Sequence, residues 1–586
     1  MSRAAGGAHG APHLIRLWFA IACGLAIGVA YADVLQPEAA SGIAPKPAVF
    51  TKRYMAVTAN PHATQAAVEM LGRGGSAVDA AIAAQLVLNL VEPQSSGLGG
   101  GGFMLVFDAR RKRLHAYDGR ETAPAAARPN RFLDAQGKPL PFHDAAVGGR
   151  SIGVPGLAAL LAAAHGRHGH LTWPKLVEPA RRLAQEGFAI SPRLHQLLAQ
   201  DKYLRGDPQA RELYYQHDGS AKPIGTVLRN PEFAAVLEEL AAGGPRGFYT
   251  GRMAEDIVAA AGGDKRQRSD LSLADVTGYR SLERRPVCGR RGAYRICGMP
   301  PPSSGGVTVL QILALLDSRR MVQAAPLSEE AVHRFAEAGR LAFADRARYL
   351  ADPDYITVPQ RALLDPAYLK RRGRLIDDGK SMGRAAPGDL DHGARAADDA
   401  PELPATTHLS IVDAQGNAVA LTSSIEDAFG SRVMVRGFLL NNQLTDFSFR
   451  FGQDGRLAAN RVEPGKRPLS SMAPTMVFDR RGRLVLVLGS PGGSRIINYV
   501  ARTLIALLDW NLPLDAALAL PHYGSRNGPT ELERGTAAEA LKPGLEARGH
   551  EVAVADMTSG LHAIQRVPGG WQGAADPRRE GSAQGR

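Results

Sequence analysis

Aromatic residues are scarce in this sequence, and its positive charge is only mildly in excess. Aromatics make up 6% of the 586 residues, and 70 lysines and arginines against 57 acidic residues give a net charge of +13. Nucleic-acid binding would need that charge gathered in a stripe with interleaved aromatics, and the sequence contains no such run. A solvated basic surface explains the excess better. Apolar content of 45% and charged content of 22% exclude collagen, low-complexity disorder and a multi-span membrane protein.

The N-terminal apolar stretch is too short to cross a bilayer comfortably. It runs from Leu17 to Val29 and follows a polar segment that carries Arg3. Ala30-Tyr31-Ala32 then supplies a small-x-small cleavage pattern. We therefore expect residues 1–32 to be a secretory signal peptide and the mature protein to be periplasmic or secreted. An uncleaved membrane anchor is the alternative interpretation.

Cysteine is almost absent, with three residues in the whole chain. Removal of the signal peptide would leave Cys288 and Cys297, in a segment typical of two short strands around a glycine-containing turn. Cysteines that face each other across such a hairpin can reach disulfide distance, and an oxidising compartment favours the bond. We expect a Cys288–Cys297 disulfide, with two buried free thiols as the alternative.

Motifs for several common chemistries are also missing. Two cysteines cannot build a Cys₄ or Cys₃His zinc site, and the sequence has no HExxH and no P-loop lysine motif. The pattern G-x-S-x-G occurs at 149–153 and 379–383, but neither copy follows a clear strand, as a serine-hydrolase elbow requires. His165, His168 and His170 fit a helix C-terminus better than a metal site. We expect neither a metal nor an organic cofactor.

At about 150 residues per domain, the length corresponds to about four domains or to one large intertwined unit. Residues 155–350 are predicted to be mostly helical, whereas 374–405 are rich in Asp, Gly, Ala and Pro and are predicted to be a flexible linker. The character changes at residue 406, where two alternating runs, 406–412 and 418–424, predict a β-hairpin. Further strands are predicted at 438–441, 475–478 and 484–488, and a helix at about 495–510.

The junction between this linker and the hairpin carries the most informative chemistry. A threonine that becomes a chain N-terminus can act as a nucleophile, because its own α-amine serves as the base. The reference pKa of an α-amine, about 7.7–8, leaves a useful fraction neutral at working pH. Thr406 would have this position if the chain were cut before it. A Thr-Thr pair alone is more often two strand residues, so the hypothesis needs an oxyanion site and a substrate clamp.

Candidates for both features occur elsewhere in the chain. Gly489-Ser-Pro-Gly-Gly-Ser494 follows an apolar strand and precedes a helix, so its backbone N–H groups could approach a developing negative charge. A phosphate-binding turn or a plain tight turn is the alternative. The clamp candidates suit the zwitterionic end of an amino acid: Arg120, Ser470 and Ser471 for a carboxylate, and Gln443 and Asp446 for an ammonium.

Several segments in the same order resemble the γ-glutamyltranspeptidase family. The resemblance runs from about residue 53 to 578 and is carried by these stretches: Asn60–Leu71, Val91–Phe103, Asp118-Gly-Arg-Glu-Thr-Ala-Pro124, Pro300–Gly306, Phe343-Ala-Asp-Arg-Ala-Arg-Tyr349, Thr406-Thr-His-Leu-Ser410, Leu440–Phe447, Pro468-Leu-Ser-Ser-Met472 and Gly489–Arg495.

This resemblance implies an α+β fold, the four-layer αββα sandwich of N-terminal nucleophile hydrolases. It implies a proenzyme that cuts itself between Ala405 and Thr406 into a large chain, 33–405, and a small chain, 406–586, which form a heterodimer. Thr406 would then attack γ-glutamyl amides such as glutathione and pass the glutamyl group to water or to an amino-acid or peptide acceptor. The oxyanion would be held by Gly492 and Gly493.

The other roles follow from the same match. Arg120, Ser470 and Ser471 would bind the α-carboxylate, and Gln443 and Asp446 the α-amine. Two positions depart from the pattern: Ser424 stands where many relatives have a threonine hydrogen-bonded to the nucleophile, and Glu426 stands where an amine-binding asparagine is common. The stretch 448–465 also lacks the aromatic lid residue of some relatives.

We therefore expect a self-processing γ-glutamyl hydrolase/transferase. A glutaryl or cephalosporin acylase on the same fold is the first alternative. An inactive, unprocessed scaffold or binding protein is the second.

Overall fold

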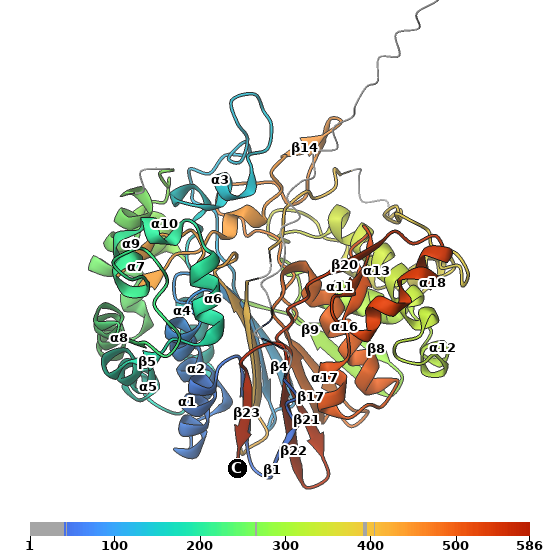
Figure 1. Ribbon diagram of the computed structural model, residues 1–586, viewed down its shortest axis with the longest axis horizontal. Coiled ribbons are helices and arrows are strands. Elements are labelled where there is room, and N and C mark those ends of the chain that lie inside the picture. The colour runs from blue at the N-terminus through green and yellow to red at the C-terminus, as the bar shows by residue number, and fades with distance from the viewer. Residues whose placement is uncertain (1–39, 41, 43, 264–266, 391–394, 404) are drawn as a thin grey trace, which may run out of the picture. The chain divides into compact units, whose positions relative to one another are not determined.

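The computed structural model describes residues 40, 42, 44–263, 267–390, 395–403 and 405–586 (Figure 1). The predicted signal peptide, 1–32, lies outside these residues. None of the helices in the described part of the chain is long and apolar enough to cross a membrane.

Two seven-stranded antiparallel sheets form the centre of the molecule. The first contains, in spatial order, β1 (Val49–Thr51), β22 (Gly570–Ala575), β21 (His562–Val567), β17 (Leu484–Gly489), β16 (Thr475–Phe478), β9 (Tyr294–Gly298) and β8 (Val287–Arg291). The second contains β23 (Ser582–Gly585), β2 (Met55–Thr58), β10 (Thr407–Val412), β11 (Ala418–Ser424), β3 (Gly101–Asp108), β4 (Arg113–Gly119) and β7 (Leu282–Arg284).

The inner faces of the two sheets share one apolar core. Met55, Phe103 and Leu105 from the second sheet are buried together with Met476 and Ile564 from the first. Alternate residues of each strand point to this core, so the sheets stack face to face.

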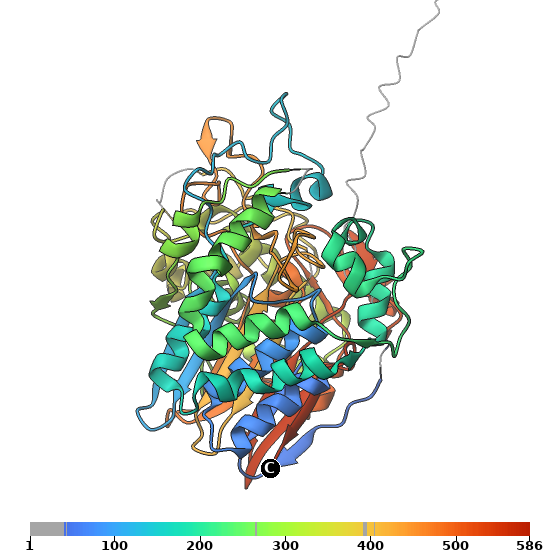
Figure 2. The same cartoon turned by 90° about the vertical axis from the view of Figure 1, so that its left-hand side faces the viewer.

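Helices cover both outer faces (Figure 1). The second sheet packs against α1 (Pro61–Gly72), α2 (Ala77–Val91) and α4 (Leu157–His168). Outside them, α5 (Trp173–Glu186) packs on α2, and α8 (Pro231–Gly243) packs on α5. The first sheet packs against α11 (Gly305–Leu315), α16 (Ile496–Leu508) and α17 (Leu514–Ala519), and α13 (Glu329–Tyr349) packs on α11. In Figure 2 the blue, teal and green helices lie in front of the strands that they cover. The predicted αββα sandwich is thereby confirmed.

The remaining helices and strands complete the fold. The other helices are α3 (Phe142–Ala146), α6 (Pro192–Gln200), α7 (Pro208–Tyr214), α9 (Gly251–Gly263), α10 (Leu273–Gly278), α12 (Ser318–Gln323), α14 (Gln360–Leu363), α15 (Pro366–Gly373) and α18 (Lys542–Ala547). The small sheets pair β5 (Phe188–Ala189) with β6 (Val227–Leu228), β12 (Met434–Val435) with β13 (Phe438–Leu439), β14 (Gly452–Gln453) with β15 (Arg456–Leu457), and β18 (Tyr523–Ser525) with β19 (Thr530–Glu533) and β20 (Val552–Ala555).

Local sequence signals explain the helices that begin the chain. The Asn60 side chain accepts a hydrogen bond from the His62 N–H, and Pro61 occupies the first turn of α1. Ser76 and Asp79 form a reciprocal capping box at the start of α2. Every residue of α2 is buried, because the helix packs on β10 and β11 of the second sheet, is flanked by α1 and α4, and is covered by α5.

The segment that precedes the hairpin has neither helix nor strand among its described residues. It follows the protein surface through specific contacts: Gly388 N–H donates to Asp345, Ala385 N–H donates to Asn527, and Ser448 Oγ donates to Asp398. The segment ends at β10, one of the central strands of the second sheet. Thr406 therefore lies at the end of a strand that is fixed by neighbours on both sides.

Candidate active site

The hydroxyl of Thr406 lies against the carbonyl of the residue before it. Thr406 Oγ1 is 2.5 Å from the Ala405 carbonyl oxygen. Ser424 Oγ donates to the same oxygen at 2.6 Å and lies 3.4 Å from Thr406 Oγ1. The pairing of Thr407 with Ser423 across β10 and β11 places these hydroxyls side by side, and the Glu426 N–H donates to Ser424 Oγ at 2.8 Å. The Ala405 carbonyl oxygen therefore contacts two hydroxyl groups, and a hydrogen bond from a hydroxyl can polarise this carbonyl.

The glycine loop follows β17 and reaches this site. Gly492 and Gly493 have φ values of 132° and 56°, in the region that favours glycine. A Cβ atom on Gly493 would lie 2.6 Å from the Leu403 carbonyl oxygen, and one on Gly492 would lie 2.6 Å from the Tyr499 ring. The loop therefore packs directly on the segment that precedes Thr406.

A small cavity of about 20 Å³ brings the predicted residues together. Its lining contains every predicted catalytic and substrate-binding residue except Gly492: Arg120, Thr406, Ser424, Glu426, Gln443, Asp446, Ser470, Ser471 and Gly493. Glu402, Leu403 and Ala405 line it as well. This space has room for about one water molecule, because the segment before Thr406 fills the rest.

Arg120 and Asp446, which the sequence assigns to opposite ends of a substrate, form an ion pair at 2.5 Å. Arg120 is fully buried and also donates to the carbonyls of Pro468 and Leu469. Gln443 Nε2 donates to the same Asp446 oxygen at 2.7 Å. Burial raises the pKa of Asp446 to about 6, although the charge of Arg120 opposes the change.

Glu426 is buried among donors and other carboxylates. It accepts hydrogen bonds from Asn442 Nδ2 and, at 3.3 Å, from the Leu403 N–H. Burial, with the charges of Asp446 and Asp427, raises its pKa well above the ordinary value. A neutral Glu426 retains a hydrogen-bonding group similar to that of an amide, which reduces the chemical difference from asparagine at this position.

Two residues near the site were not predicted from the sequence. The Glu402 carboxylate accepts from Ser471 Oγ at 2.6 Å and forms an ion pair with Arg346. Arg346 also donates to Ser471 Oγ at 3.0 Å and to Ser304 Oγ at 2.8 Å. Arg346 lies in segment 343–349, one of the stretches that carry the family resemblance, but its partners are far away in the sequence.

The disulfide lies in the first sheet. Cys288 on β8 faces Cys297 on β9 with a Cα–Cα distance of 4.1 Å, and the two sulfurs are bonded. Neither cysteine lines the cavity at Thr406.

The serine and histidine residues noted in the other sequence motifs are held by hydrogen bonds. Ser151, in the first G-x-S-x-G pattern, donates to the Ala146 and Gly148 carbonyls. His168 is hydrogen-bonded to the Tyr117 hydroxyl, and His165 to the Leu171 carbonyl.

One group within the described residues has the composition of a metal site: His333, Glu337 and His550. His333 Nε2 is 2.6 Å from the Asp377 carbonyl oxygen, so this nitrogen carries the proton and Nδ1 is an acceptor. His550 Nε2 donates to that Nδ1 at 2.7 Å, and Thr530 Oγ1 lies 2.8 Å from His550 Nδ1. Burial lowers the pKa of His550 to about 4. The two histidines therefore satisfy each other in a hydrogen-bond chain.

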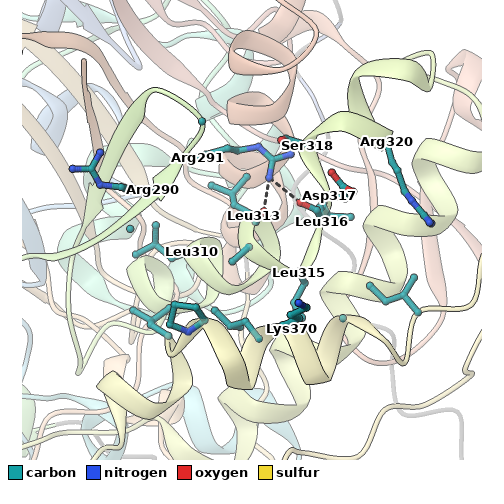
Figure 3. A pocket seen from close by; sticks show the side chains of 18 of the residues that line it. Arg290, Arg291, Leu310, Leu313, Leu315, Leu316, Asp317, Ser318, Arg320 and Lys370 are labelled. Atoms are coloured by element: carbon teal, nitrogen blue, oxygen red, sulfur yellow. Dashed lines mark hydrogen bonds between the residues drawn. The ribbon is translucent and has the colours of Figure 1, made fainter. Parts of the chain in front are cut away.

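A much larger cavity, of about 920 Å³, lies beside the disulfide (Figure 3). Leu310, Leu313 and Leu316 form part of its wall, and Arg291 donates to the carbonyls of Leu313 and Leu316. It shares no lining residue with the cavity at Thr406. The larger cavity therefore lacks the Thr406 hydroxyl, the glycine loop and the Arg120–Asp446 ion pair described above.

Comparison with known proteins agrees with this geometry. Residues 63–586 match the γ-glutamyltranspeptidase family. The chain is 37% identical to a glutathione hydrolase proenzyme of Escherichia coli, over 90% of this chain and 91% of that protein. It is 33% identical to the acylase ACY 1 proenzyme of a Pseudomonas species, over 94% and 97%.

Among solved structures, a cephalosporin acylase from Bacillus halodurans superimposes with a TM-score of 0.80 at 25% identity, over 94% of this chain and 99% of that one. The family match spans the strands from β3 onward, the glycine loop and the residues around Thr406. This chain belongs to the γ-glutamyltranspeptidase family.

Proposed function

We propose that this protein is a self-processing γ-glutamyl hydrolase/transferase with Thr406 as its nucleophile. The observation that carries the proposal is the contact of Thr406 Oγ1 and Ser424 Oγ with the Ala405 carbonyl oxygen. The similarity to glutathione hydrolase proenzymes supports glutathione and related γ-glutamyl amides as donors.

Maturation begins when Thr406 Oγ1 attacks the carbonyl carbon of Ala405. The C–N bond of the Ala405–Thr406 peptide breaks, the nitrogen takes a proton, and an ester joins Ala405 to the threonine oxygen. Water then hydrolyses the ester. The products are a large chain ending at Ala405 and a small chain that begins with the hydroxyl and free α-amine of Thr406.

Turnover repeats this chemistry on the donor. The α-amine of Thr406 accepts the hydroxyl proton as Oγ1 attacks the γ-glutamyl carbonyl, and the backbone N–H groups of Gly492 and Gly493 stabilise the oxyanion. Ser424 orients the nucleophile. The amine product leaves, and the acyl-enzyme transfers its glutamyl group to water or to an amino-acid or peptide acceptor.

The charges around the cavity suit a zwitterionic donor. Its α-carboxylate binds Arg120, Ser470 and Ser471, and its α-amine binds Gln443 and Asp446, with Glu426 beside them. Arg120 and Asp446 neutralise each other before the donor enters. The amino-acid end of a bound donor supplies a carboxylate to Arg120 and an ammonium to Asp446, so neither buried charge is left without a partner.

The signal-like N-terminus supports a periplasmic or secreted heterodimer, and the proposed chemistry needs no metal or organic cofactor. Purified protein should cleave γ-glutamyl-p-nitroanilide, and the Thr406→Ala variant should be inactive. A Thr406→Ala variant that retains full activity would overturn the assignment.

The acylase relatives favour one alternative function. An acylase of that kind would cleave a glutaryl amide, which lacks the α-amine, in preference to its γ-glutamyl counterpart. Comparing kcat/KM for the two p-nitroanilides decides between these functions. A single uncleaved, inactive chain would instead support a scaffold protein.

A further inference from the structure

We propose that the end of the sandwich opposite Thr406 is a docking surface for anionic phospholipid head groups. Thr406 precedes β10, whose six residues, at about 3.3 Å each, place Val412 about 20 Å away at the other end of the sheet. The C-terminus also lies at this end, since Met55 pairs with both Val412 and Gly585 (Figure 1). This surface is therefore separate from the site that carries the proposed function.

Turns between strands bring exposed cations to this end. These cations, called the basic end below, are Lys52 and Arg53 between β1 and β2, residues 110–113 (Arg-Arg-Lys-Arg) around the β3–β4 turn, Arg480, Arg481 and Arg483 between β16 and β17, and Arg566 near the end of β21. All of them are exposed. The basic end therefore gathers part of the chain's net charge of +13 on one face.

Contacts between the turns show that the basic end is one surface. The Phe107 and Phe478 rings, at the ends of β3 and β16, have centroids 5.0 Å apart and join the two sheets. The Cβ position of Gly416, in the β10–β11 turn, is 3.7 Å from Ala109 Cβ and 4.0 Å from Arg566 Nη2. Because β10 and β11 separate β2 from β3, the cations of the second sheet spread over about 14 Å.

Few of these cations have an acidic partner. Arg111 pairs with Asp108 at 3.1 Å, and Arg483 pairs with Asp479 at 2.7 Å. Among the described residues, no ion pair is recorded for the other cations of the basic end. Burial and the positive charge of Arg483 lower the pKa of Arg566, although Asp479 opposes the change. The cations therefore repel one another, and contact with an anionic surface would relieve that repulsion.

The form of the basic end favours a lipid bilayer over a nucleic acid. Base stacking requires a series of exposed rings, whereas Phe107, Phe478 and Trp571 are buried. Phe50, two residues before Lys52, is 51% exposed. A single exposed aromatic side chain beside cations suits insertion at the head-group boundary of an anionic membrane. The proposed periplasmic or secreted location would bring the protein to such surfaces.

The test is co-sedimentation of the purified protein with lipid vesicles. Wild type should bind vesicles of phosphatidylglycerol and phosphatidylcholine in equal parts at low salt, and about 0.5 M salt should release it. It should not bind vesicles of phosphatidylcholine alone. Arg110→Ala/Lys112→Ala/Arg113→Ala should weaken binding about 100-fold, because each cation near an anionic surface contributes about 5-fold.

The matched control is Lys138→Ala/Lys202→Ala/Lys380→Ala, which removes three exposed cations from other parts of the surface and gives the same net charge. It should bind as wild type does. Phe50→Ser should weaken binding about 10-fold, because its ring would no longer be buried in the lipid.

Melting temperatures show whether each variant is folded. If the first triple variant is unfolded, Arg480→Ala/Arg481→Ala replaces it and should weaken binding about 25-fold by the same estimate. Hydrolysis of γ-glutamyl-p-nitroanilide should be the same in all folded variants, since the basic end lies far from Thr406.

A wild type that does not bind the anionic vesicles, equal losses in the basic-end and control variants, or tighter binding to duplex DNA than to the vesicles would overturn the inference. None of these results bears on the proposed function. Failure of the proposed function would instead appear as a wild type that binds vesicles but has no hydrolytic activity.

Discussion

Two hydroxyl groups share one carbonyl oxygen at the start of β10. In the proposed maturation, Thr406 supplies the oxygen that attacks, and the hydrogen bond from Ser424 polarises the carbonyl of Ala405. The same Ser424 hydrogen bond can stabilise the negative charge that develops on the Ala405 oxygen during attack.

Replacing Ser424 with alanine should slow the first cleavage about 100- to 1,000-fold, the usual effect of removing one oxyanion donor. The measurement is the fraction of cleaved chain against time in freshly purified protein. Ser424→Thr, which keeps the hydroxyl, is the control. Equal rates for wild type and Ser424→Ala would contradict the role of this hydroxyl.

The pKa of Asp446 predicts how donor preference changes with pH. Its pKa is raised to about 6, mainly by burial, so protonation begins at a higher pH than for an ordinary aspartate. A protonated Asp446 no longer attracts the donor's ammonium. The ratio of kcat/KM for γ-glutamyl- over glutaryl-p-nitroanilide should therefore fall as the pH decreases from about 7 to about 5.

The ratio cancels titration of the Thr406 α-amine, which both donors require. Asp446→Asn should remove most of the pH dependence of the ratio. A ratio that is constant in wild type would show that Asp446 does not bind the amine.

At the scale of elements, the site depends on how a glycine loop meets an extended segment. Gly493 has a φ of 56°, and its missing side chain leaves room for the Leu403 carbonyl. Gly482, in the turn between β16 and β17, has a φ of 73° with nothing near its Cβ position. The two glycines therefore share the backbone conformation and differ in packing.

Gly493→Ala should prevent or severely slow cleavage, because its Cβ would lie 2.6 Å from the Leu403 oxygen and displace the segment. Gly482→Ala should cost only about 1–2 kcal/mol of backbone strain and cleave normally. Thermal unfolding and gel analysis of both variants make the comparison. Normal cleavage in Gly493→Ala would contradict close packing of the loop on this segment.

Most elements near the site could be predicted because their signals are local. The Ser76–Asp79 capping box sets the start of α2, and alternation predicts β10 and β11 to within one residue. The strand predicted at 438–441 is shorter, because the Asn441 N–H donates to Gly99 instead of continuing the β12–β13 pairing. The contacts of Arg346 with Glu402 and Ser471 could not be predicted, since they depend on tertiary packing of distant segments.

At the scale of the whole molecule, cleavage would divide a chain whose two parts already share both sheets. In the second sheet, β10 and β11 lie between β2 and β3. In the first, β16, β17, β21 and β22 lie between β1 and β9. Strands on either side of residue 405 thus alternate, and their separation would expose the common core.

The two chains should therefore remain together after cleavage. They should co-elute in native size-exclusion chromatography and separate only in denaturant. Reducing agent should not release them, because Cys288 and Cys297 both lie in the large chain. Separate elution under native conditions would contradict the interleaved sheets.

Intact-mass analysis of the purified protein, paired with N-terminal sequencing, tests the central claim most directly. We predict two chains from the wild type, with the small chain comprising residues 406–586 and beginning at Thr406, and one uncut chain from Thr406→Ala. A small chain that begins at any other residue, a wild type that stays whole, or a Thr406→Ala variant that is still cut there would contradict it.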